Sequence, residues 1–409
     1  MKKLLILGLG IFLLGTGCEK PVRNNKEIVK SEDIIINNDL NLLNQRVFLS
    51  DDTSIYKFVD TLNPSAKSEV TSSITIQLIA NLQSPKYNDE VLQASHIRIV
   101  NGYAYVSYNT QGPRYLGGAD IVDVNSPAML KLISSVIFIN EETNMGKDIS
   151  SIDVEPKGSG NNNCVWLVGA EEGNESLQSP AIVERYILNS ANQFKHSDDP
   201  KQFYDLPGYV GTDVRFNDNK VYVTSGTGGG LTVLNNGFNK IDFFDLQNAR
   251  SVDINSDYIL ALGGFPGYLL RPGFFYENIG GANDPEAKSI LRLYNNFALV
   301  SLGEAGLKCY DMSSETPSVA VSSLPGPVVP DGKDSREYVT NGVSVNNGWV
   351  YVANGAGGLD IAKIDINGML KWKGNINLGA SVNFVEANAD YVFVATGLRG
   401  LKILKVVEL

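Results

Sequence analysis

A strand pattern that is apolar on both faces recurs along the chain and limits the fold more than any other feature. Its clearest copy runs from Trp349 to Ile364, WVYVANGAGGLDIAKI, and indicates two antiparallel strands joined by a glycine-rich turn. Tyr351 points to the same side as Trp349, whereas Val350 and Val352 point to the other, so both faces of this strand are expected to be buried. A single hairpin cannot bury both faces alone, so neighbouring sheets must cover it.

Near copies of this strand occur seven times and indicate a repeat protein. The intervals between them range from 38 to 61 residues, and the chain shows no helical pattern at this period. Propeller blades of four strands span roughly 40 to 50 residues, and loop insertions account for the longer intervals. The repeats therefore predict an all-β fold, a seven-bladed β-propeller of four-stranded antiparallel blades. The copies begin at Tyr103, Cys164, Lys220, Tyr258, Phe297, Trp349 and Tyr391.

Each copy is the second strand, B, of a unit whose first strand, A, precedes it. Tight turns of Asn, Asp and Gly join A to B, as at Asn101–Gly102 and at 346–348, and these residues tolerate the positive φ of such hairpins. Strand C follows a glycine-rich turn. The repeats cover about residues 95–409 and end at a strand C, so the strand-like stretch at 74–82 is expected to close the ring as the missing strand D, because an open edge invites aggregation.

The repeat units resemble those of bacterial LVIVD-repeat proteins, which read roughly NxAYVAxGxxGLxIxDVSxP. The resemblance covers about Ser95 to Leu409 and rests on strands such as GADIVDV at Gly118 and on the turns NSP at Asn125 and SETP at Ser314. It implies a β-propeller in secreted or surface-anchored bacterial proteins. It supplies no reaction, because the motif residues are structural.

The first 18 residues have the layout of an export signal. Met1 to Cys18 carries two lysines, an apolar stretch shorter than a typical membrane span, and small residues before the cysteine. Its end resembles the lipobox of bacterial lipoproteins, which implies a diacylglycerol on the Cys18 thiol, cleavage before Cys18, and acylation, for example with palmitate, of the new amino group. Several acyl chains anchor a protein stably. The alternative is an ordinary secretory signal with a chance cysteine.

The resemblance predicts a protein exported to the bacterial envelope and anchored in the outer membrane. Residues 19–73 are polar with short apolar islands, and we interpret them as a tether between the anchor and a propeller at 74–409. The formal net charge is -11, which disfavours nucleic acid as a partner because that affinity depends on neutralising phosphates. The expected partners are the membrane, through the lipid, and a protein or glycan.

The sequence shows no enzyme motif, and we predict no catalytic residue, metal or cofactor. Only two histidines are present, and they are well separated from the cysteines, so no zinc set assembles. Cys164 and Cys309 lie three blades apart and are therefore beyond the reach of a disulfide bond, so we expect both to be buried thiols. The aromatic residues of strand B, such as Tyr105 and Trp166, are expected to pack between blades.

Loop lengths divide the predicted disc into two faces. The A to B and C to D links are mostly short and define a short-turn face, whereas the B to C and D to A links hold the insertions and define a long-loop face.

Function usually lies where a scaffold varies, although unselected drift in loop length is the alternative. Aromatic and arginine side chains on these loops are contact types frequent at interfaces. The predicted partner-binding residues are Tyr108, Arg114, Tyr115, Tyr268, Arg271, Phe274 and Tyr276. The last four belong to the insertion at 263–287, whose centre could also form the outer strands of a degenerate blade.

The alternative function is a propeller enzyme, of hydrolase or lyase type, with its site at the channel mouth. Several polar residues at or beside the start of a strand A are candidates for such a site, although we favour the explanation that these polar groups simply line a wet channel. An enzyme requires an acid, a base and a pocket that converge on one point. The candidates are His96, Asp148, Asp153, Asp213 and Arg250.

Overall fold

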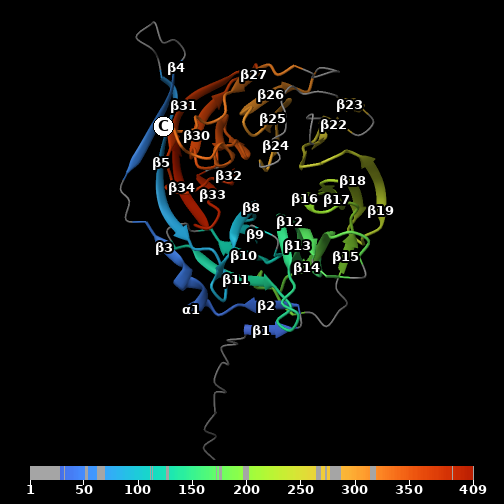
Figure 1. Cartoon of the computed structure of the whole chain (residues 1–409). Coiled ribbons are helices and arrows are strands. Elements are labelled where there is room, and N and C mark those ends of the chain that lie inside the picture. Colours follow the sequence, from blue (N-terminus) through green and yellow to red (C-terminus); the bar gives the residue numbers. More distant parts are fainter. Residues whose placement is uncertain are drawn as a thin grey trace, which may run out of the picture.

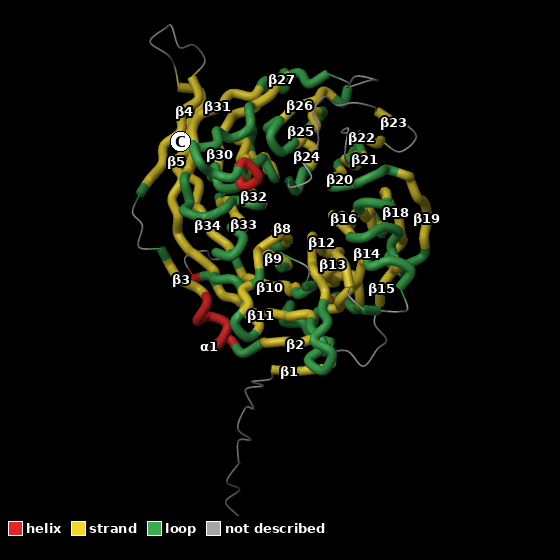
Figure 2. The backbone as a smooth tube through the Cα atoms, viewed as in Figure 1, coloured by secondary structure: helices red, strands yellow, loops and turns green. Residues whose placement is uncertain are grey.

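The computed structural model describes residues 28–408 except 32, 51–53, 62–69, 111, 113, 126–128, 172, 175–176, 197–201, 264–268, 272–273, 277–286, 314–318 and 389. Its strands form a β-propeller whose four-stranded antiparallel blades are arranged around one axis (Figure 1 and Figure 2). This confirms the predicted all-β propeller of four-stranded antiparallel blades. The signal, Met1 to Cys18, lies outside the described residues.

Six blades consist of four consecutive strands each. The first contains β8 (Gln93–Val100), β9 (Tyr103–Asn109), β10 (Gly117–Asp123) and β11 (Lys131–Phe138), and the second β12 (Lys147–Ser159), β13 (Asn162–Glu171), β14 (Ala181–Ile187) and β15 (Gln202–Asp205). The third contains β16 (Gly211–Asn217), β17 (Lys220–Ser225), β18 (Gly230–Asn235) and β19 (Lys240–Asp245), and the fourth β20 (Ser251–Ile254), β21 (Ile259–Leu262), β22 (Leu269–Arg271) and β23 (Phe274–Tyr276). The fifth contains β24 (Leu291–Tyr294), β25 (Phe297–Ser301), β26 (Leu307–Asp311) and β27 (Ser322–Leu324), and the sixth β28 (Gly342–Asn346), β29 (Trp349–Ala353), β30 (Leu359–Ile364) and β31 (Leu370–Ile376).

A further sheet joins the two ends of the described chain. It contains β32 (Phe384–Asn388), β33 (Tyr391–Ala395) and β34 (Leu401–Glu408), and β5 (Val70–Leu82) pairs antiparallel with β34. The pairing runs from Leu401 opposite Leu82 to Glu408 opposite Ile74, with a bulge at Ile403. The innermost strands contact one another in the order β8, β12, β16, β20, β24, β28, β32 and back to β8.

The stretch at 19–73, which we interpreted as a tether whose apolar islands left open some packing against the propeller, pairs with the propeller in several segments from Ile28 onward. β1 (Ile28–Ser31) and β2 (Ile34–Asn37) extend the first blade, because β2 pairs with β11. β3 (Val47–Leu49) and β4 (Ile55–Thr61) both pair with β5. The tether prediction is wrong for these segments, because their short apolar islands supply strand residues such as buried Ile36. The remaining named elements are α1 (Leu40–Leu43), η1 (Asn44–Arg46), η3 (Ser335–Glu337) and the hairpin of β6 (Lys86–Tyr87) and β7 (Glu90–Val91).

The short turns between strands A and B have the predicted chemistry. Asn101, Asn219, Asn295 and Asn347 have φ of 50°, 58°, 52° and 51°. This left-handed region costs energy for most side chains, whereas Asn tolerates it comparatively well. The Asn-rich turns therefore explain why strands A and B meet as tight hairpins on the short-turn face.

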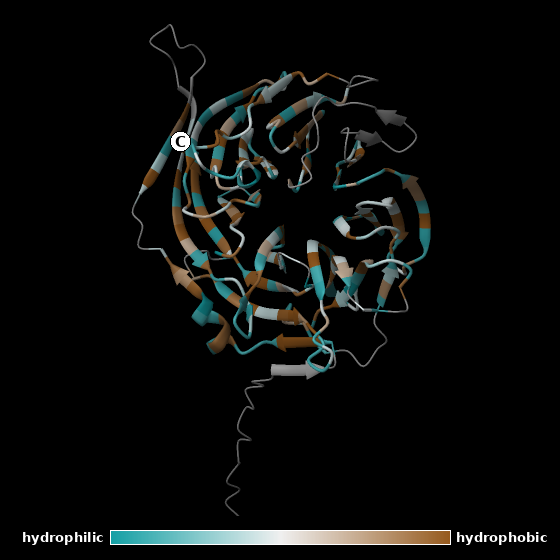
Figure 3. Ribbon diagram, in the orientation of Figure 1, coloured by the Kyte–Doolittle hydropathy of each residue, from teal (hydrophilic) through white to brown (hydrophobic). Residues whose placement is uncertain are grey.

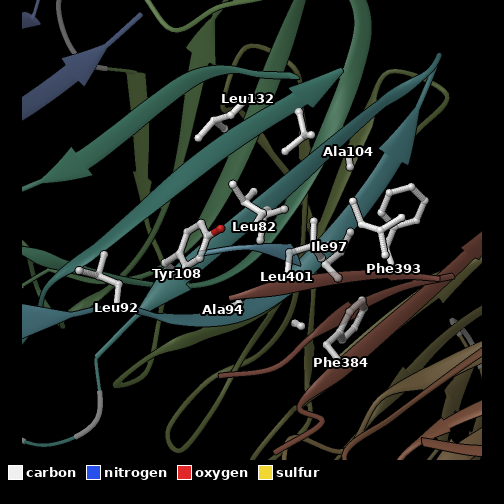
Figure 4. Packing of buried hydrophobic residues seen from close by; sticks show 14 of the residues in the cluster. Leu82, Leu92, Ala94, Ile97, Ala104, Tyr108, Leu132, Phe384, Phe393 and Leu401 are labelled. Carbon is white, nitrogen blue, oxygen red and sulfur yellow. The ribbon is translucent and has the colours of Figure 1, made fainter. Parts of the chain in front are cut away.

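The core lies between blades. Tyr105 and Trp166 of strands B are fully buried, as predicted, and so are the free thiols of Cys164 and Cys309. Figure 3 shows hydrophobic residues on strands all around the ring. Figure 4 shows one cluster in which Leu82 and Phe384 from the last sheet pack close to Ile97 of the first blade, so apolar contacts cover the join between the chain ends.

Replacing Ile76 by Ala tests the contribution of β5. The Ile76 side chain is fully buried opposite Val406 of β34, so its truncation is expected to cost about 2–5 kcal/mol in the free energy of unfolding. The matched control is Ile55→Ala in β4, because Ile55 is 63% exposed and its loss is expected to cost less than about 0.5 kcal/mol. Urea unfolding measures both, and equal midpoints for the two variants would show that β5 is not a structural part of the ring.

Candidate functional site

A cavity of about 1100 Å³ opens at one mouth of the central channel. It lies on the long-loop face, because the residues that line it belong to B to C and D to A links or to the first residues of strands A. The starts of strands A in all six blades, or the residues just before them, contribute to its wall together with the last sheet. Its lining includes Asn109, Thr110, Ser150, Val210, Arg250, Lys288, Arg336, Asn341, Ser381, Asn383 and Arg399.

The wall of the cavity is polar and carries excess positive charge. Amide and hydroxyl side chains alternate around it, and no aromatic residue is among the described residues that line it. Four basic side chains face two acidic ones, Asp334 and Glu337. Arg336 pairs with Asp334 at 2.6 Å on the exposed rim, and the other basic residues of the lining are Arg250, Lys288 and Arg399. A basic cavity in a protein of net charge -11 favours a ligand with an acidic group.

Bulges in three successive strands A shape the floor of the cavity. The pairing with strand B shifts register around Ser95 in β8, around Ser150 in β12 and around Thr212 in β16. A bulge leaves its extra residue out of the strand ladder, so that its backbone groups can bond elsewhere. All three residues line the cavity.

Lys288 uses two of these freed backbone groups. Its Nζ donates hydrogen bonds to the carbonyl oxygen of Ser95 and, at 2.9 Å, to that of Ser150. Its backbone N–H donates to Asn341 Oδ1 at 3.1 Å. Burial, together with cationic Arg292 and Arg215, lowers the pKa of the Lys288 amine to about 7 against the opposing effect of Asp213.

Beneath this floor, Asp213 is a fully buried carboxylate with a dense set of donors. Its Oδ1 accepts from Ser151 Oγ at 2.7 Å and Arg215 Nη1 at 3.1 Å, and its Oδ2 accepts from Ser251 Oγ at 2.7 Å. Burial acts to raise its pKa, but Arg215, Arg292 and these hydrogen bonds outweigh burial and lower it.

His96 lies beside Asp213 but does not hydrogen-bond to it. His96 Nε2 is 3.7 Å from Asp213 Oδ1, and its ring packs on Phe384 with centroids 4.1 Å apart. Burial and the neighbouring cations, of which Lys288 has the largest effect, lower the pKa of His96 well below its ordinary value. The imidazole is therefore neutral at neutral pH. Neither His96 nor Asp213 lines the cavity.

One layer deeper, charged side chains of alternating sign link the strands A. Arg98 Nε is 2.8 Å from Asp153 Oδ1, and Arg215 Nε is 3.3 Å from Asp253 Oδ1. Glu386 joins the end of this series, with Arg98 at 3.5 Å and Arg292 at 3.6 Å. These arginines, together with Lys288, were missed by sequence reasoning. The signal that could have found them is the charged residue that recurs at the same position of strand A in six units.

The structure places the five channel-mouth candidates in three different settings. It brings His96, Asp153 and Asp213 together inside the channel, below the floor. Arg250 lines the cavity. Asp148 lies apart from these, where its Oδ1 accepts from the backbone of Thr110 at 3.1 Å and of Leu116 at 3.2 Å and so fixes the link between β9 and β10.

The predicted partner-binding residues do not form one surface. Tyr108 is fully buried and its hydroxyl donates to Asp120 Oδ2 at 2.8 Å, so its assignment to an exposed loop is wrong: β9 extends through this residue. Arg114 and Tyr115 are half-buried on the long-loop face, where Arg114 pairs with Glu90 at 2.6 Å.

The other four partner-binding candidates belong to the fourth blade. Tyr268 lies outside the described residues. Arg271 of β22 and Phe274 of β23 pair with each other beside the C to D turn, which belongs to the short-turn face. Tyr276 pairs with Leu269 at the other end of these strands. The insertion therefore forms the outer strands of the blade, and Arg271 and Phe274 do not belong to the long-loop face.

Comparisons with known proteins support the fold alone. No protein-family model and no curated protein sequence matches the chain. The WD40 β-propeller domain of Doa1 superposes with a TM-score of 0.55 at 12% identity, covering 81% of this chain and 96% of that one. A catalytically inactive virginiamycin B lyase from Staphylococcus aureus, solved with quinupristin, gives a TM-score of 0.51 at 10% identity, covering 82% and 100%. Across the described part of the chain, none of the helices has the length and apolarity that a membrane crossing requires.

Asp148 predicts a pH dependence of stability. Burial raises its pKa from 3.8 to about 6, against the hydrogen bonds from Thr110 and Leu116 that act to lower it. The unfolded chain therefore loses this proton first as the pH rises. As the pH rises from 4 to 7, the free energy of unfolding of the wild type is expected to fall by up to about 3 kcal/mol relative to that of Asp148→Asn. This figure follows from roughly 1.4 kcal/mol for each unit by which the pKa is raised. Urea unfolding at pH 4, 5, 6 and 7 measures the difference, and a constant difference would contradict the raised pKa.

Proposed function

We propose that this protein is an exported, lipid-anchored β-propeller that binds a polar group of a protein or glycan partner in the cavity of its long-loop face. The observation that carries the proposal is the position of the cavity. It lies at the channel mouth, and links from most of the blades converge on it. Concave sites with convergent polar groups are the usual form of binding sites in rigid scaffolds.

The chemistry of the wall supports a polar ligand. Amide groups such as those of Asn341, Asn377 and Asn383 can donate and accept hydrogen bonds, as hydroxyl-rich sugars and peptide backbones require. Arg250, Lys288 and Arg399 favour an acidic group on that ligand. His96 and Asp213 lie beneath the floor, so the cavity supports binding more directly than it supports acid–base catalysis by this pair.

The proposal includes a seven-bladed ring that β5 closes and an anchor at Cys18 in the outer membrane. The pairing of β5 with β34 and the contact of β32 with β8 support the ring. The apolar stretch and small residues before Cys18 support the anchor. Residues 19–27 can reach at most about 30 Å, so the propeller would be held close to the membrane surface.

Reversing the charge of Arg399 tests the binding proposal. Arg399 is exposed and lines the cavity, so Arg399→Glu is expected to reduce retention of the partner at least about fivefold, as loss of a binding hot spot does. The matched control is Lys220→Glu, the same charge change at an exposed position of the short-turn face. Pull-down of the lipidated protein from intact cells, with quantification of what accompanies it, measures both. Equal retention by the two variants would contradict the assignment of the face.

Replacing Cys18 by Ser tests the anchor. Without the thiol no diacylglycerol can attach, so the exported protein is expected to move from the membrane fraction to the soluble fraction. Fractionation and immunoblotting measure this, with the mass of the mature N-terminus as a second readout. Membrane retention of the variant after removal of the signal would contradict lipidation.

A further inference from the structure

Lys288 forms a bridge across the channel mouth. Its backbone lies just before β24 and is held by Asn341 at the start of the sixth blade, while its Nζ reaches carbonyl groups of β8 and β12 in the first two blades. Lys288 is half-buried and lines the cavity, so a molecule in the cavity can touch its amine.

Backbone irregularities of two kinds, a left-handed residue and two bulges, hold Lys288 in this position. Ser289, which follows it, is fully buried in the left-handed region with a φ of 56°. The bulges at Ser95 and Ser150 supply the two carbonyl oxygens that the amine uses. Bulges and left-handed residues other than glycine cluster at functional sites, because the surrounding structure must maintain them.

Two hydrogen bonds to carbonyl oxygens are compatible with a neutral amine at Lys288. An ammonium group has three N–H donors, whereas a neutral amine has two donors and one lone pair. Lys288 Nζ has two carbonyl acceptors, and the salt bridges within the described residues include no carboxylate partner for it. Its charged and titratable surroundings are His96, Asp213, Arg215 and Arg292, and burial with the two arginines lowers its pKa to about 7.

The rest of the cavity suits a ligand with a carboxylate. Arg250 and Arg399 line the same space as Lys288, and arginine is well suited to binding carboxylates. An amine with an available lone pair attacks a carbonyl carbon. A ligand that meets both groups carries a carbonyl and a carboxylate.

We propose that Lys288 is a nucleophilic amine that binds a small oxo acid in this cavity as an imine. The lone pair of Nζ attacks the carbonyl carbon, the carbonyl oxygen takes up protons and leaves as water, and a C=N bond replaces the C=O bond without any change of oxidation state. The inference rests on the proposed binding function of the cavity and adds the class of ligand and the residue that holds it.

Reductive labelling tests the proposal without knowledge of the natural ligand. The full-length protein in detergent is treated with glyoxylate and sodium cyanoborohydride at pH 7, and the modified lysines are mapped by mass spectrometry. Lys288 is expected to react at least about tenfold faster than exposed Lys333, because an ordinary exposed lysine is almost wholly protonated at this pH. Its rate is expected to rise with pH and level off with a midpoint near 7. A rate no faster than that of Lys333 would overturn the proposal.

Two further measurements separate the parts of the inference. Arg399→Ala is expected to slow the labelling of Lys288 by glyoxylate at least about threefold and to leave labelling by formaldehyde, which has no carboxylate, unchanged. An equal effect on both probes would overturn the assignment to an oxo acid. Lys288→Arg keeps a donor for the two carbonyls but is expected to abolish glyoxylate binding in calorimetry. If retention of the partner depends on Arg399 but Lys288 is not labelled preferentially, the imine is overturned and the proposed binding function stands.

Discussion

Burial of both faces of each sheet is the constraint on which this structure depends. In β29, Val350 and Tyr351 point to opposite faces, yet they are 0% and 1% exposed. A sheet of this kind has no face for water, so it is stable only between two other sheets. Each sheet therefore needs a neighbouring sheet on both of its faces. The first and the last sheets cover each other around Leu82, Ile97 and Phe384. The N-terminal strand β5 is part of that cover.

The same arrangement forces polar groups into the centre. The strands A converge on the axis, and charged side chains fill much of the space between them. Burying an isolated charge costs several kcal/mol, so each charge must find partners in neighbouring blades. Asp213 meets this demand with Ser151, Arg215 and Ser251, which come from three successive strands A. The polar interior therefore joins the blades sideways, in addition to isolated backbone bridges between neighbouring sheets such as Gly303 with Thr340.

The sequence predicted the parts of the fold that repeat and missed those that occur once. The strand pattern, the Asn-rich turns and the strand at 74–82 could be predicted, because each either recurs or completes a recurrence. β2 and β3 could not, since they are short apolar islands in a polar stretch and gain stability only from edges that other strands provide. Tyr108 was misplaced because the polar residues after it hide that strand B extends to Asn109.

The site was harder to predict for a physical reason. Within one unit, a charged residue two positions from a buried one in strand A has the same pattern whether it faces solvent or a closed channel. Only the recurrence of a charge at the same position in six units distinguishes Arg215 and Arg292 from surface residues. Lys288 lies in the link before β24, and this link has no hydrophobic periodicity from which the position of its side chain could be predicted. Its role depends on carbonyl groups that bulges at Ser95 and Ser150 release, and a bulge changes the register without leaving a clear mark in composition.

The two kinds of link explain why one face can hold a site while the ring stays intact. A to B turns connect adjacent strands by the shortest path, so a change there disturbs the hairpin itself. D to A links return from the outer edge of one blade to the axis of the next, and therefore end at the channel mouth. Their last residues, such as Arg250 and Lys288, reach the cavity whatever length of chain precedes them. Insertions in these links can alter the wall of the cavity without changing the packing between blades, which makes the long-loop face the one where specificity can vary at little cost in stability.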